Sequence, residues 1–306
     1  MAGSLEQVGV IGLGNMGGRI ARRIRDGGGH RVLGYDASPV AAERSGIGVA
    51  DSVAALMAQV DAAFLSLPDS GVVEAVVYAP DGLLASARAG QIVVDLSTAD
   101  PSSSARIHAD LAARDVEFLD AGISGGAAAA EQGSLAIMVG GSPEALETVR
   151  GVLDSFASSV YHMGEPGSGH TAKVLNNFLN AISLAATAEV MVAGRKAGLD
   201  LARLLDVLNH SSGVNFATQN RFPRIIEGDY LEGGLTCELM SKDVRLYLEL
   251  VRQLRVSSLT GAACLGAFDL ASALGYGKQI SNRVVDAIGD VSGGVRVHGS
   301  QQGGSQ

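Results

Sequence analysis

The feature that most constrains the fold lies within the first 17 residues, where a short apolar run leads into a glycine-rich turn. Residues 7–11 (QVGVI) have the β-branched composition of a buried strand, and the next six residues are Gly12-Leu13-Gly14-Asn15-Met16-Gly17. A helical pattern over residues 15–25 follows. Since a strand, a glycine turn and a helix in this order open a crossover connection, we expect an α/β fold.

The same alternation of strand and helix continues to about residue 163. Further strands are predicted at residues 31–35, 61–67, 91–95, 116–120, 134–139 and 159–162, and helices at residues 39–45, 101–113 and 143–154. Pro101 opens the second of these helices, at the position where proline is favoured. The pattern indicates a Rossmann-type domain, a mostly parallel sheet with helices on both faces.

The pattern changes after Pro166. Apolar residues at helical spacing predict one long helix over residues 170–197, long enough to join two domains. Shorter helices are expected at residues 201–209, 215–226, 237–254, 259–274 and 280–288. We therefore predict a dinucleotide-binding Rossmann domain at 1–165, an all-helical substrate and dimerisation domain at 166–292, and a disordered tail rich in glycine, serine and glutamine at 293–306.

The glycine turn has the spacing of a phosphate-binding site. Gly12 permits a sharp turn, Gly14 lets a pyrophosphate approach the backbone, and Gly17 lets the helix pack on the strand. The helix N-terminus attracts the phosphate charge. We assign Gly12, Leu13, Gly14, Asn15, Met16 and Gly17 to a dinucleotide cofactor; the competing interpretation is a bare strand–helix turn.

An acidic residue, Asp36, ends the second predicted strand, 22 residues beyond Gly14. A carboxylate there accepts hydrogen bonds from the adenosine ribose and repels a 2′-phosphate. Ala37 and Ser38 follow, so no arginine stands beside it to hold that phosphate. We predict that NAD is preferred over NADP; the competing interpretation is a turn aspartate before Pro39.

Composition excludes several classes of partner. A net charge of −9 argues against nucleic acid and anionic membranes. No run of 18 apolar residues lacks a glycine or a charge, and the N-terminus has no basic segment before its apolar run, so we expect neither a membrane span nor a signal peptide. Cys237 and Cys264 lie far apart, which suits a reducing cytoplasm. The histidines have no ligand spacing, so no metal site is predicted.

Five further motifs carry a family resemblance. They are Leu67-Pro68, Asp95-Leu96-Ser97-Thr98, the segment DAGISGG at residues 120–126, the segment GSGHTAKVLNN at residues 167–177, and Lys242-Asp243. Together with the glycine turn, in this order and over residues 7–290, they resemble the β-hydroxyacid dehydrogenases, the group of 3-hydroxyisobutyrate dehydrogenase and tartronate semialdehyde reductase within the 6-phosphogluconate dehydrogenase superfamily. The resemblance implies reversible NAD(P)-linked oxidation of a small 3-hydroxy acid.

Lys173 is the predicted catalytic acid/base. Removing hydride from an alcohol requires a group that takes the hydroxyl proton. Lys173 begins the long helix after a Gly-Ser-Gly segment, where we expect it to face an interdomain cleft that closes on binding. Desolvation and the helix dipole would both lower its pKa there. The family has its catalytic lysine at this position, and Asn177, four residues on, matches the family asparagine that orients the substrate.

The other site residues follow from the resemblance. Ser124, Gly125 and Gly126 match the site that grips the substrate carboxylate with a hydroxyl and backbone amides. Cofactor contacts are predicted at Leu67, Pro68, Thr98 and Lys242, the last of which could instead be an ordinary helix-surface charge. Gly122 and Ile123 stand where the family commonly has proline and valine, and Val72 stands where it often has asparagine.

Several alternatives stay open at this point. His170 could act as a base or line the site, and Arg221 could bind a second anionic group or lie at the surface. An imine reductase shares this architecture but usually lacks the lysine, and a non-catalytic dinucleotide-binding module would not need Ser124, Lys173 and Asn177 together. The apolar helical domain predicts a homodimer or homotetramer, with interfaces over residues 174–192 and 246–274.

Overall fold

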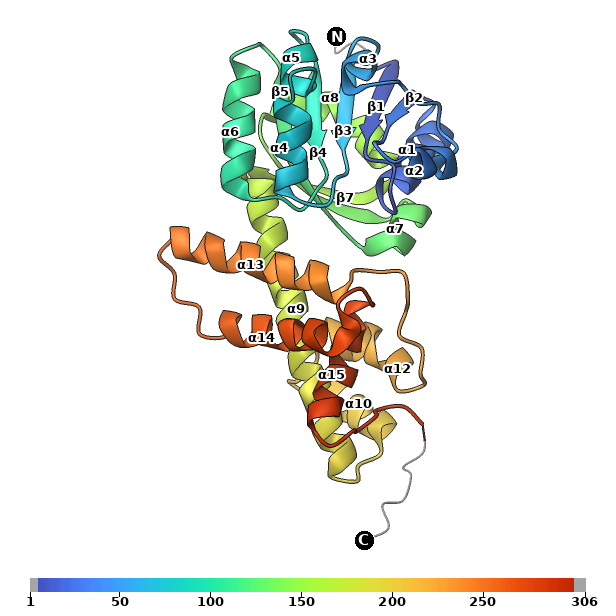
Figure 1. The fold of residues 1–306 in the computed structure, drawn as a ribbon, viewed down its shortest axis with the longest axis vertical. Helices are drawn as coiled ribbons and strands as arrows, with labels where there is room; N and C mark the ends of the chain where they lie inside the picture. The colour runs from blue at the N-terminus through green and yellow to red at the C-terminus, as the bar shows by residue number, and fades with distance from the viewer. Residues whose placement is uncertain (1–4, 300–306) are drawn as a thin grey trace. The chain divides into compact units, whose positions relative to one another are not determined.

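The structure is a computed structural model that describes residues 5–299. The chain divides into two compact units, Met1–Lys173 and Val174–Gln306 (Figure 1). The division falls inside the long helix α9 (Ser168–Lys196), whereas the sequence predicts a domain boundary just before that helix.

The first unit is built on a seven-stranded sheet with the order β2-β1-β3-β4-β5-β6-β7. Every neighbouring pair is parallel except β5 and β6, which are antiparallel. The sheet therefore is mostly parallel, as predicted, with one reversal next to β5. The strands are β1 (Gln7–Ile11), β2 (Arg31–Tyr35), β3 (Ala62–Leu65), β4 (Ile92–Asp95), β5 (Glu117–Ser124), β6 (Leu135–Gly140) and β7 (Ala157–Gly164).

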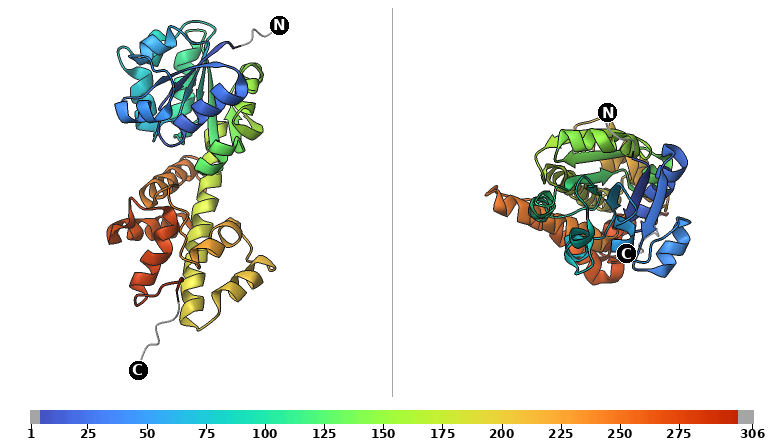
Figure 2. Two further views of the ribbon diagram at one scale, coloured as in Figure 1. Left: turned by 90° about the vertical axis from the view of Figure 1, so that its right-hand side faces the viewer. Right: turned by 90° about the horizontal axis from the view of Figure 1, so that it is seen from above.

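Helices cover both faces of this sheet (Figures 1 and 2). Alternate strand residues enter two separate apolar clusters, because successive side chains of a strand point to opposite faces. One cluster holds α1 (Gly17–Gly28), α7 (Gly126–Gln132) and α8 (Pro143–Asp154). The other holds α3 (Val53–Met57), α4 (Ser70–Tyr78), α5 (Leu83–Ser86) and α6 (Pro101–Ala112); the short α2 (Pro39–Ser45) follows β2.

Four helices of this unit, α3, α4, α5 and α7, are absent from the sequence prediction. The helix α4 shows why: its sequence SGVVEAVVY is rich in valine, which favours strands. The Asp69 side chain accepts a hydrogen bond from the backbone N–H of Val72 at 3.0 Å and so caps the helix. Tertiary burial of Val73 and Val77 then outweighs the propensity.

The second unit is helical and packs around α9. Its other helices are α10 (Leu201–Asn209), α11 (Phe216–Asn220), α12 (Phe222–Ile225), α13 (Cys237–Gln253), α14 (Gly261–Ala271) and α15 (Val284–Val291), with a π turn at Ser272–Tyr276 and a 3₁₀ turn at Ser281–Arg283. Phe178 of α9 stacks on Tyr247 of α13 with the ring centroids 3.6 Å apart.

Two predicted helices of this unit are interrupted. The helix expected over residues 215–226 breaks at Arg221, because Pro223 opens a new helix and has no N–H to continue the old one. The helix expected over residues 259–274 passes into the π turn, where Gly275 has a φ of 92°.

The prediction of disorder is wrong for residues 293–299. Val297 is buried in the helical core, and its carbonyl accepts a hydrogen bond from the Arg195 guanidinium. The order of this segment could not be predicted from composition, because one buried apolar residue, Val297, holds the segment against the helical core. The remainder of the predicted tail, residues 300–306, lies outside the described residues.

Among the described residues, α9 is the one helix long and apolar enough to cross a membrane, by length and composition alone. The sequence analysis did not expect such a helix. Its apolar side chains instead form the centre of the helical core, where Ala181, Leu184, Ala188 and Met191 have no exposed surface. Core packing accounts for its hydropathy.

Candidate active site

The glycine turn between β1 and α1 requires glycine at its two ends. Gly12 has a φ of 92°, and a Cβ on it would lie 2.4 Å from the carbonyl oxygen of Ser66. A Cβ on Gly17 would lie 1.8 Å from the carbonyl oxygen of Gly12. Real atoms do not approach so closely, so the helix can reach the strand only without these side chains.

The middle of the turn is open. A Cβ on Gly14 would meet no atom of the described residues within 4 Å, and Met16, at the N-cap of α1, makes no side-chain capping hydrogen bond. Helix N-termini leave backbone N–H groups for external acceptors, and their dipole favours negative charge. The turn therefore fits the pyrophosphate of a dinucleotide.

Asp36 lies against this turn. One carboxylate oxygen accepts a hydrogen bond from the N–H of Leu13 at 2.7 Å, and the other accepts one from the N–H of Ser38 at 2.7 Å. These bonds bring the end of β2 to the glycine turn. Each oxygen keeps a lone pair that could accept a hydrogen bond from a ribose hydroxyl group.

The loops after β3 and β4 meet through a serine. The Ser97 hydroxyl accepts a hydrogen bond from the N–H of Leu67 at 3.0 Å, and the Ser97 N–H donates to the Asp95 carboxylate at 3.0 Å. Pro68 and Thr98 follow Leu67 and Ser97 directly. Four of the residues that carry the resemblance therefore lie at the carboxyl ends of two neighbouring parallel strands. Asp95 is fully buried, and burial raises its pKa above the ordinary carboxyl range.

Ser124 ends β5, and the two glycines after it make the bend into α7. Gly125 and Gly126 both have positive φ, 128° and 72°. A Cβ on Gly125 would lie 2.6 Å from the Cβ of Ala129. The segment predicted as a carboxylate site is thus a defined turn with its backbone exposed at the end of a strand.

Lys173 lies in the first turns of α9 with only 8% of its surface exposed. The start of this helix is held by Asp120 of β5, whose carboxylate accepts hydrogen bonds from the N–H groups of Gly167 and His170, both at 2.7 Å. Asp120 is itself fully buried. A carboxylate at a helix N-terminus satisfies unpaired N–H groups and complements the dipole.

One face of β5 carries the residues nearest to Lys173. Asp120, Gly122 and Ser124 alternate along the strand and so point to the same side of the sheet. Asp120 binds the helix N-terminus, and Gly122 lies against the side chain of Lys173. The strand periodicity places the Ser124 hydroxyl about 7 Å farther along the same face.

His170 is a buried structural residue in this arrangement. Its ring lies 2.7 Å from the Ser104 hydroxyl through Nδ1 and 3.2 Å from the Asp95 carbonyl through Nε2. Both ring nitrogens are thereby occupied within the protein. These contacts favour the site-lining role over that of a base.

In the second unit, Asn177 is buried and donates a hydrogen bond to the Asp243 carboxylate at 2.6 Å. The other oxygen of Asp243 lies 3.1 Å from the Lys242 ammonium. Asn177 and Lys242 are therefore linked through one buried acid. The sequence analysis assigned no role to Asp243. The feature that could have revealed this role is the position of an acidic residue directly after Lys242 in the motif.

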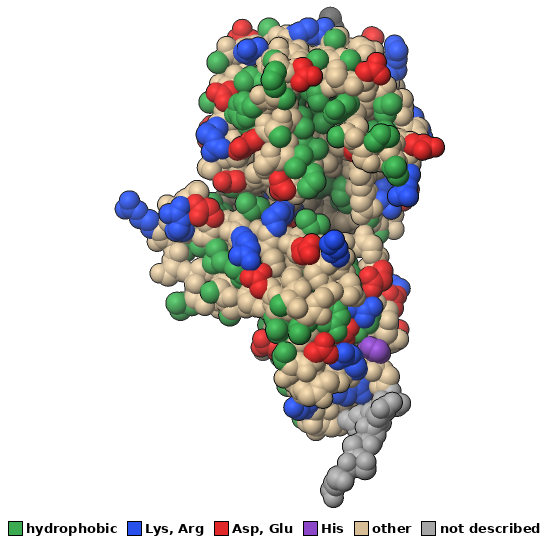
Figure 3. Space-filling model, in the orientation of Figure 1, with side chains coloured by type: hydrophobic (Ala, Val, Ile, Leu, Met, Phe, Trp, Pro, Cys, Tyr) green, Lys and Arg blue, Asp and Glu red, His purple; other side chains and the backbone are tan. Residues whose placement is uncertain are grey.

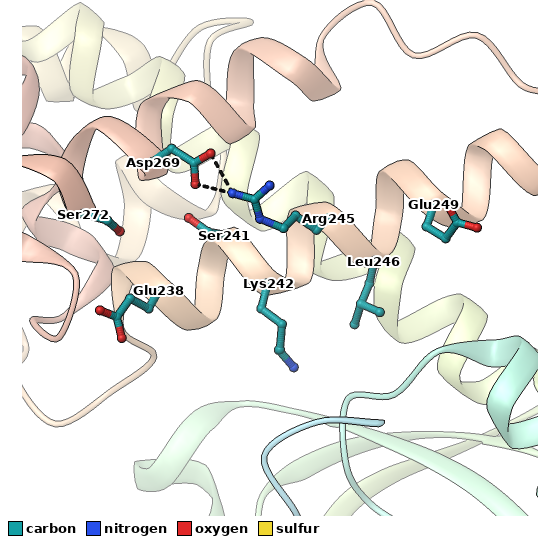
Figure 4. Close-up of a pocket in the computed structure, with 8 residues that line it drawn as sticks. All are labelled: Glu238, Ser241, Lys242, Arg245, Leu246, Glu249, Asp269 and Ser272. Carbon is teal, nitrogen blue, oxygen red and sulfur yellow. Dashed lines mark hydrogen bonds and ion pairs between the residues drawn. The ribbon is translucent and has the colours of Figure 1, made fainter. Parts of the chain in front are cut away.

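Lys242 lines a cavity of about 460 Å³ between α13 and α14 (Figure 4). Its side chain projects away from the ion pair that Arg245 makes with Asp269, at 2.9 and 2.8 Å. Ser241, whose buried hydroxyl has no partner among the described residues, also lines this cavity. Lys242 thus has open space beside it.

Arg221 is half-buried, and its side chain is held within the protein, which favours a role inside the helical unit over the surface alternative. Its guanidinium donates to the side-chain oxygens of Asn282 at 2.9 Å and Asn180 at 3.0 Å. Burial lowers its pKa to about 10.

Acidic and basic side chains are interspersed over the face of the molecule drawn in Figure 3. No cluster of three or more metal-ligating side chains occurs within residues 5–299.

Comparison with known proteins gives two family matches that together span most of the chain. Residues 7–164 match the NAD binding domain of 6-phosphogluconate dehydrogenase. Residues 167–288 match the NAD-binding family of NADP-dependent 3-hydroxyisobutyrate dehydrogenase.

Individual relatives cover nearly the whole chain. A 2-(hydroxymethyl)glutarate dehydrogenase of Eubacterium barkeri is 32% identical, over 96% of this chain and 98% of its own. An NAD-dependent L-serine dehydrogenase of Pseudomonas aeruginosa is 34% identical, over 90% and 95%. The solved structure of a Mycobacterium tuberculosis 3-hydroxyisobutyrate dehydrogenase with L-serine has a TM-score of 0.83 and 28% identity, over 92% of this chain and 98% of its own.

Proposed function

The chain belongs to the β-hydroxyacid dehydrogenase family and is an NAD(P)-dependent oxidoreductase that reversibly oxidises a small 3-hydroxy acid, and on that premise we propose which residues perform the reaction. A nicotinamide cofactor held at the glycine turn would supply the acceptor for the hydride that leaves the hydroxyl-bearing carbon. The protein must bind the cofactor and the substrate carboxylate, and must take the hydroxyl proton.

Lys173 takes that proton through its side-chain amine. An amine acts as a base only when it is neutral, and burial favours the neutral form. The Asp120 carboxylate offsets the helix dipole at the start of α9. Burial is therefore the effect that favours the neutral amine, and the helix dipole contributes less than the sequence alone suggests.

Ser124 and the amides of Gly125 and Gly126 bind the substrate carboxylate. The observation that carries this proposal is the shared face of β5, on which Asp120 holds the start of the lysine helix, Gly122 lies against Lys173, and Ser124 follows. Asn177 orients the substrate, and its hydrogen bond to Asp243 fixes its own amide.

The cofactor binds at the glycine turn and the loops that hold Leu67, Pro68 and Thr98, with Lys242 contributing from α13. Asp36 favours NAD, since its carboxylate lies at the turn where an adenosine ribose would be held and would repel a 2′-phosphate. The test is kcat/KM measured with both cofactors. An equal or higher value with NADP would overturn the preference.

The substrate is a small 3-hydroxy acid, as supported by relatives named for 2-(hydroxymethyl)glutarate, L-serine, 3-hydroxyisobutyrate and L-threonate. The decisive experiment is a screen of small 2- and 3-hydroxy acids that follows NADH formation. A cyclic imine with NADPH belongs in the same screen, because turnover of the imine alone would reject the proposal.

Lys173→Ala should reduce turnover of the substrate so identified by about 10²–10⁴-fold, the usual contribution of a general acid/base. Binding of NAD should be nearly unchanged. Lys196→Ala, an exposed lysine at the other end of the same helix, is the matched control and should turn over normally. Retained turnover in Lys173→Ala would defeat the assignment.

We further propose a homodimer or homotetramer in a reducing cytoplasm. The predicted interface segments carry exposed apolar side chains, among them Leu179, Val190 and Leu259 at 64%, 44% and 92% exposure. Cys237 and Cys264 are free and buried. Light scattering tests the assembly, and a monomeric mass would contradict it.

A further inference from the structure

Arg221 carries a positive charge that no acidic side chain of the described residues neutralises. Its guanidinium donates hydrogen bonds to the side-chain oxygens of Asn180 and Asn282, which are both neutral. No ion pair between Arg221 and a carboxylate occurs within residues 5–299, and desolvation lowers its pKa to about 10. Withdrawing a charge from water without a counter-ion is costly. An arginine held in this way points to an anion that a ligand supplies.

The neighbouring Arg283 has the ordinary arrangement. Its guanidinium forms ion pairs with Asp286 at 3.0 Å and with Glu232 at 3.1 Å. Arg283 directly follows Asn282, the residue that binds Arg221, so both arginines belong to one region of the helical unit. The protein supplies acids for Arg283 and amides for Arg221, which leaves the charge of Arg221 for an outside partner.

The surroundings of Arg221 are fixed, but some of its donors are available. A guanidinium has five N–H donors, and the hydrogen bonds to Asn180 and Asn282 each use one. The Nε–H of Arg221 and the side-chain N–H₂ group of Asn180 have no partner among the described residues, and neither group is enclosed in the protein. The N–H₂ group of Asn282 donates to the Tyr230 carbonyl at 2.8 Å, which holds that amide in place. Fixed and accessible donors around a cation suit a carboxylate.

Asn180 connects Arg221 to a residue already assigned to the substrate. It lies three positions after Asn177 on α9, so the two residues are neighbours on the helix surface, about 4.5 Å apart along the axis. Asn177 is the residue proposed to orient the substrate, and its own amide is held by Asp243. A substrate that contacts Asn177 needs only a short further carbon chain to reach Asn180 and Arg221.

We propose that Arg221 and Asn180 form a subsite for a second carboxylate of the substrate, so that the preferred 3-hydroxy acid is a dicarboxylic acid. This proposal rests on the proposed function, because it places the subsite next to Asn177. Ser124 and the following amides bind the carboxylate beside the reacting carbon, and Arg221 binds the one at the far end. Arg221 is then a specificity-determining residue that takes no part in the chemical step.

A matched pair of substrates tests the subsite in the wild type. 2-(Hydroxymethyl)glutarate carries the second carboxylate, and 2-(hydroxymethyl)pentanoate has a methyl group in its place. Hydrogen bonds to charged groups are worth enough to favour the dicarboxylic acid by about 10- to 100-fold in kcat/KM. Equal kcat/KM for the two acids, or a higher value for the pentanoate, would overturn the proposal.

Arg221→Gln removes the charge and keeps an amide that can donate to Asn180 or Asn282. It should raise KM for the dicarboxylic acid by about 10- to 100-fold and leave kcat/KM for the pentanoate within about twofold. Arg224→Gln is the matched control, because it removes the same charge from an exposed arginine that pairs with Asp229, and it should keep the wild-type preference. Equal losses for both acids in Arg221→Gln would show a purely structural role.

A binding measurement does not depend on turnover. Glutarate lacks the hydroxyl group and is not oxidised, so calorimetric titration of the NAD-loaded protein reports on the subsite alone. The Kd for glutarate should rise about 10-fold or more in Arg221→Gln and stay unchanged in Arg224→Gln. If the wild type oxidises no hydroxy acid, the proposed function fails while this titration still decides the subsite. Equal glutarate affinity in the wild type and Arg221→Gln would reject it. If Arg221→Gln does not fold, Arg221→Lys, which keeps the charge, should retain a preference for the dicarboxylic acid, and loss of that preference would count against the proposal.

Discussion

Two helices that begin in the sheet unit start in close contact with a strand, and they differ in what accepts hydrogen bonds from their N-terminal N–H groups. At α1, glycines bring the helix onto β1, and the N-cap residue Met16 makes no side-chain hydrogen bond. At α9, Gly169 brings the helix onto β5 in the same manner, but the Asp120 carboxylate accepts two of its N–H groups. One end is open to an anion from outside, and the other is filled by an anion of the protein.

The difference teaches what each helix end is for. An open N-terminus attracts phosphate and can be emptied and refilled as ligands come and go. A helix N-terminus whose N–H groups are bound by a buried carboxylate is rigid, and its dipole is neutralised. Such a terminus holds the side chains of its first turns in fixed positions. Lys173 stands on the closed end, and the cofactor phosphates are assigned to the open one.

The largest effect is expected from removing the internal anion. Asp120→Asn replaces one acceptor oxygen by an N–H₂ group that faces a backbone N–H, so a buried donor loses its partner. Stability should fall by about 2–4 kcal/mol. Urea or thermal denaturation measures this, with the exposed Asp154→Asn as control. A loss no greater than that of the control would mean that the two helix ends do not differ as described.

At the open end, the effect should appear in ligand binding and not in folding. Gly14→Ala adds a methyl group that meets no described atom within 4 Å, so the fold should tolerate it. Because the methyl group would occupy the space for the pyrophosphate, the Kd for NAD should rise roughly 10- to 100-fold, or about 1.4–2.8 kcal/mol.

Gly17→Ala is the contrasting variant at this turn. Its Cβ would lie 1.8 Å from the Gly12 carbonyl oxygen, so it should destabilise the protein before any cofactor is added. Calorimetric titration and melting curves for the two variants together test the distinction. Normal NAD affinity in Gly14→Ala would argue against phosphate binding at α1.

The smallest effect concerns Asp95, which shares the buried surroundings of His170. Burial raises the folded-state pKa of Asp95, so between the ordinary carboxyl pKa and this raised value the folded protein holds a proton that the unfolded chain has released. Stability from this group therefore falls as pH rises through that window. Asp95→Asn lacks the effect, so its melting temperature should gain on the wild type as the pH rises above the ordinary carboxyl pKa of about 4.

The expected gain is about 1.4 kcal/mol for each unit by which the pKa is raised. Melting curves of both proteins over this pH range provide the measurement. A difference in melting temperature that stays constant with pH would contradict a raised pKa for Asp95.

The sequence predicted the elements whose signals are local. Strands β1 and β2 and helices α2 and α8 have the predicted bounds, because short β-branched runs and proline-opened helices need no tertiary information. The valine-rich α4 was missed because burial decided its state. The packed residues near Val297 were missed because one anchoring contact is invisible in composition.

The residues of the candidate site also differ in whether a local sequence pattern could reveal their roles. Motif spacing singled out Lys173, Ser124 and Asn177, since each lies in a recognisable segment. The roles of Asp120 and Asp243 depend on which strand or helix lies opposite them. Such partners are set by topology, so a linear pattern indicates that these residues are present but not what they touch.

The two native thiols have a practical consequence for following motion in this protein. Cys237 and Cys264 are buried, and burial raises the pKa values of these thiols to about 11 and about 12. Near neutral pH very little of either thiol would therefore be thiolate, the form that reacts with maleimides. A fluorophore could therefore be coupled to a single introduced surface cysteine on each unit, without first replacing the native pair, to watch the two units as NAD and substrate bind.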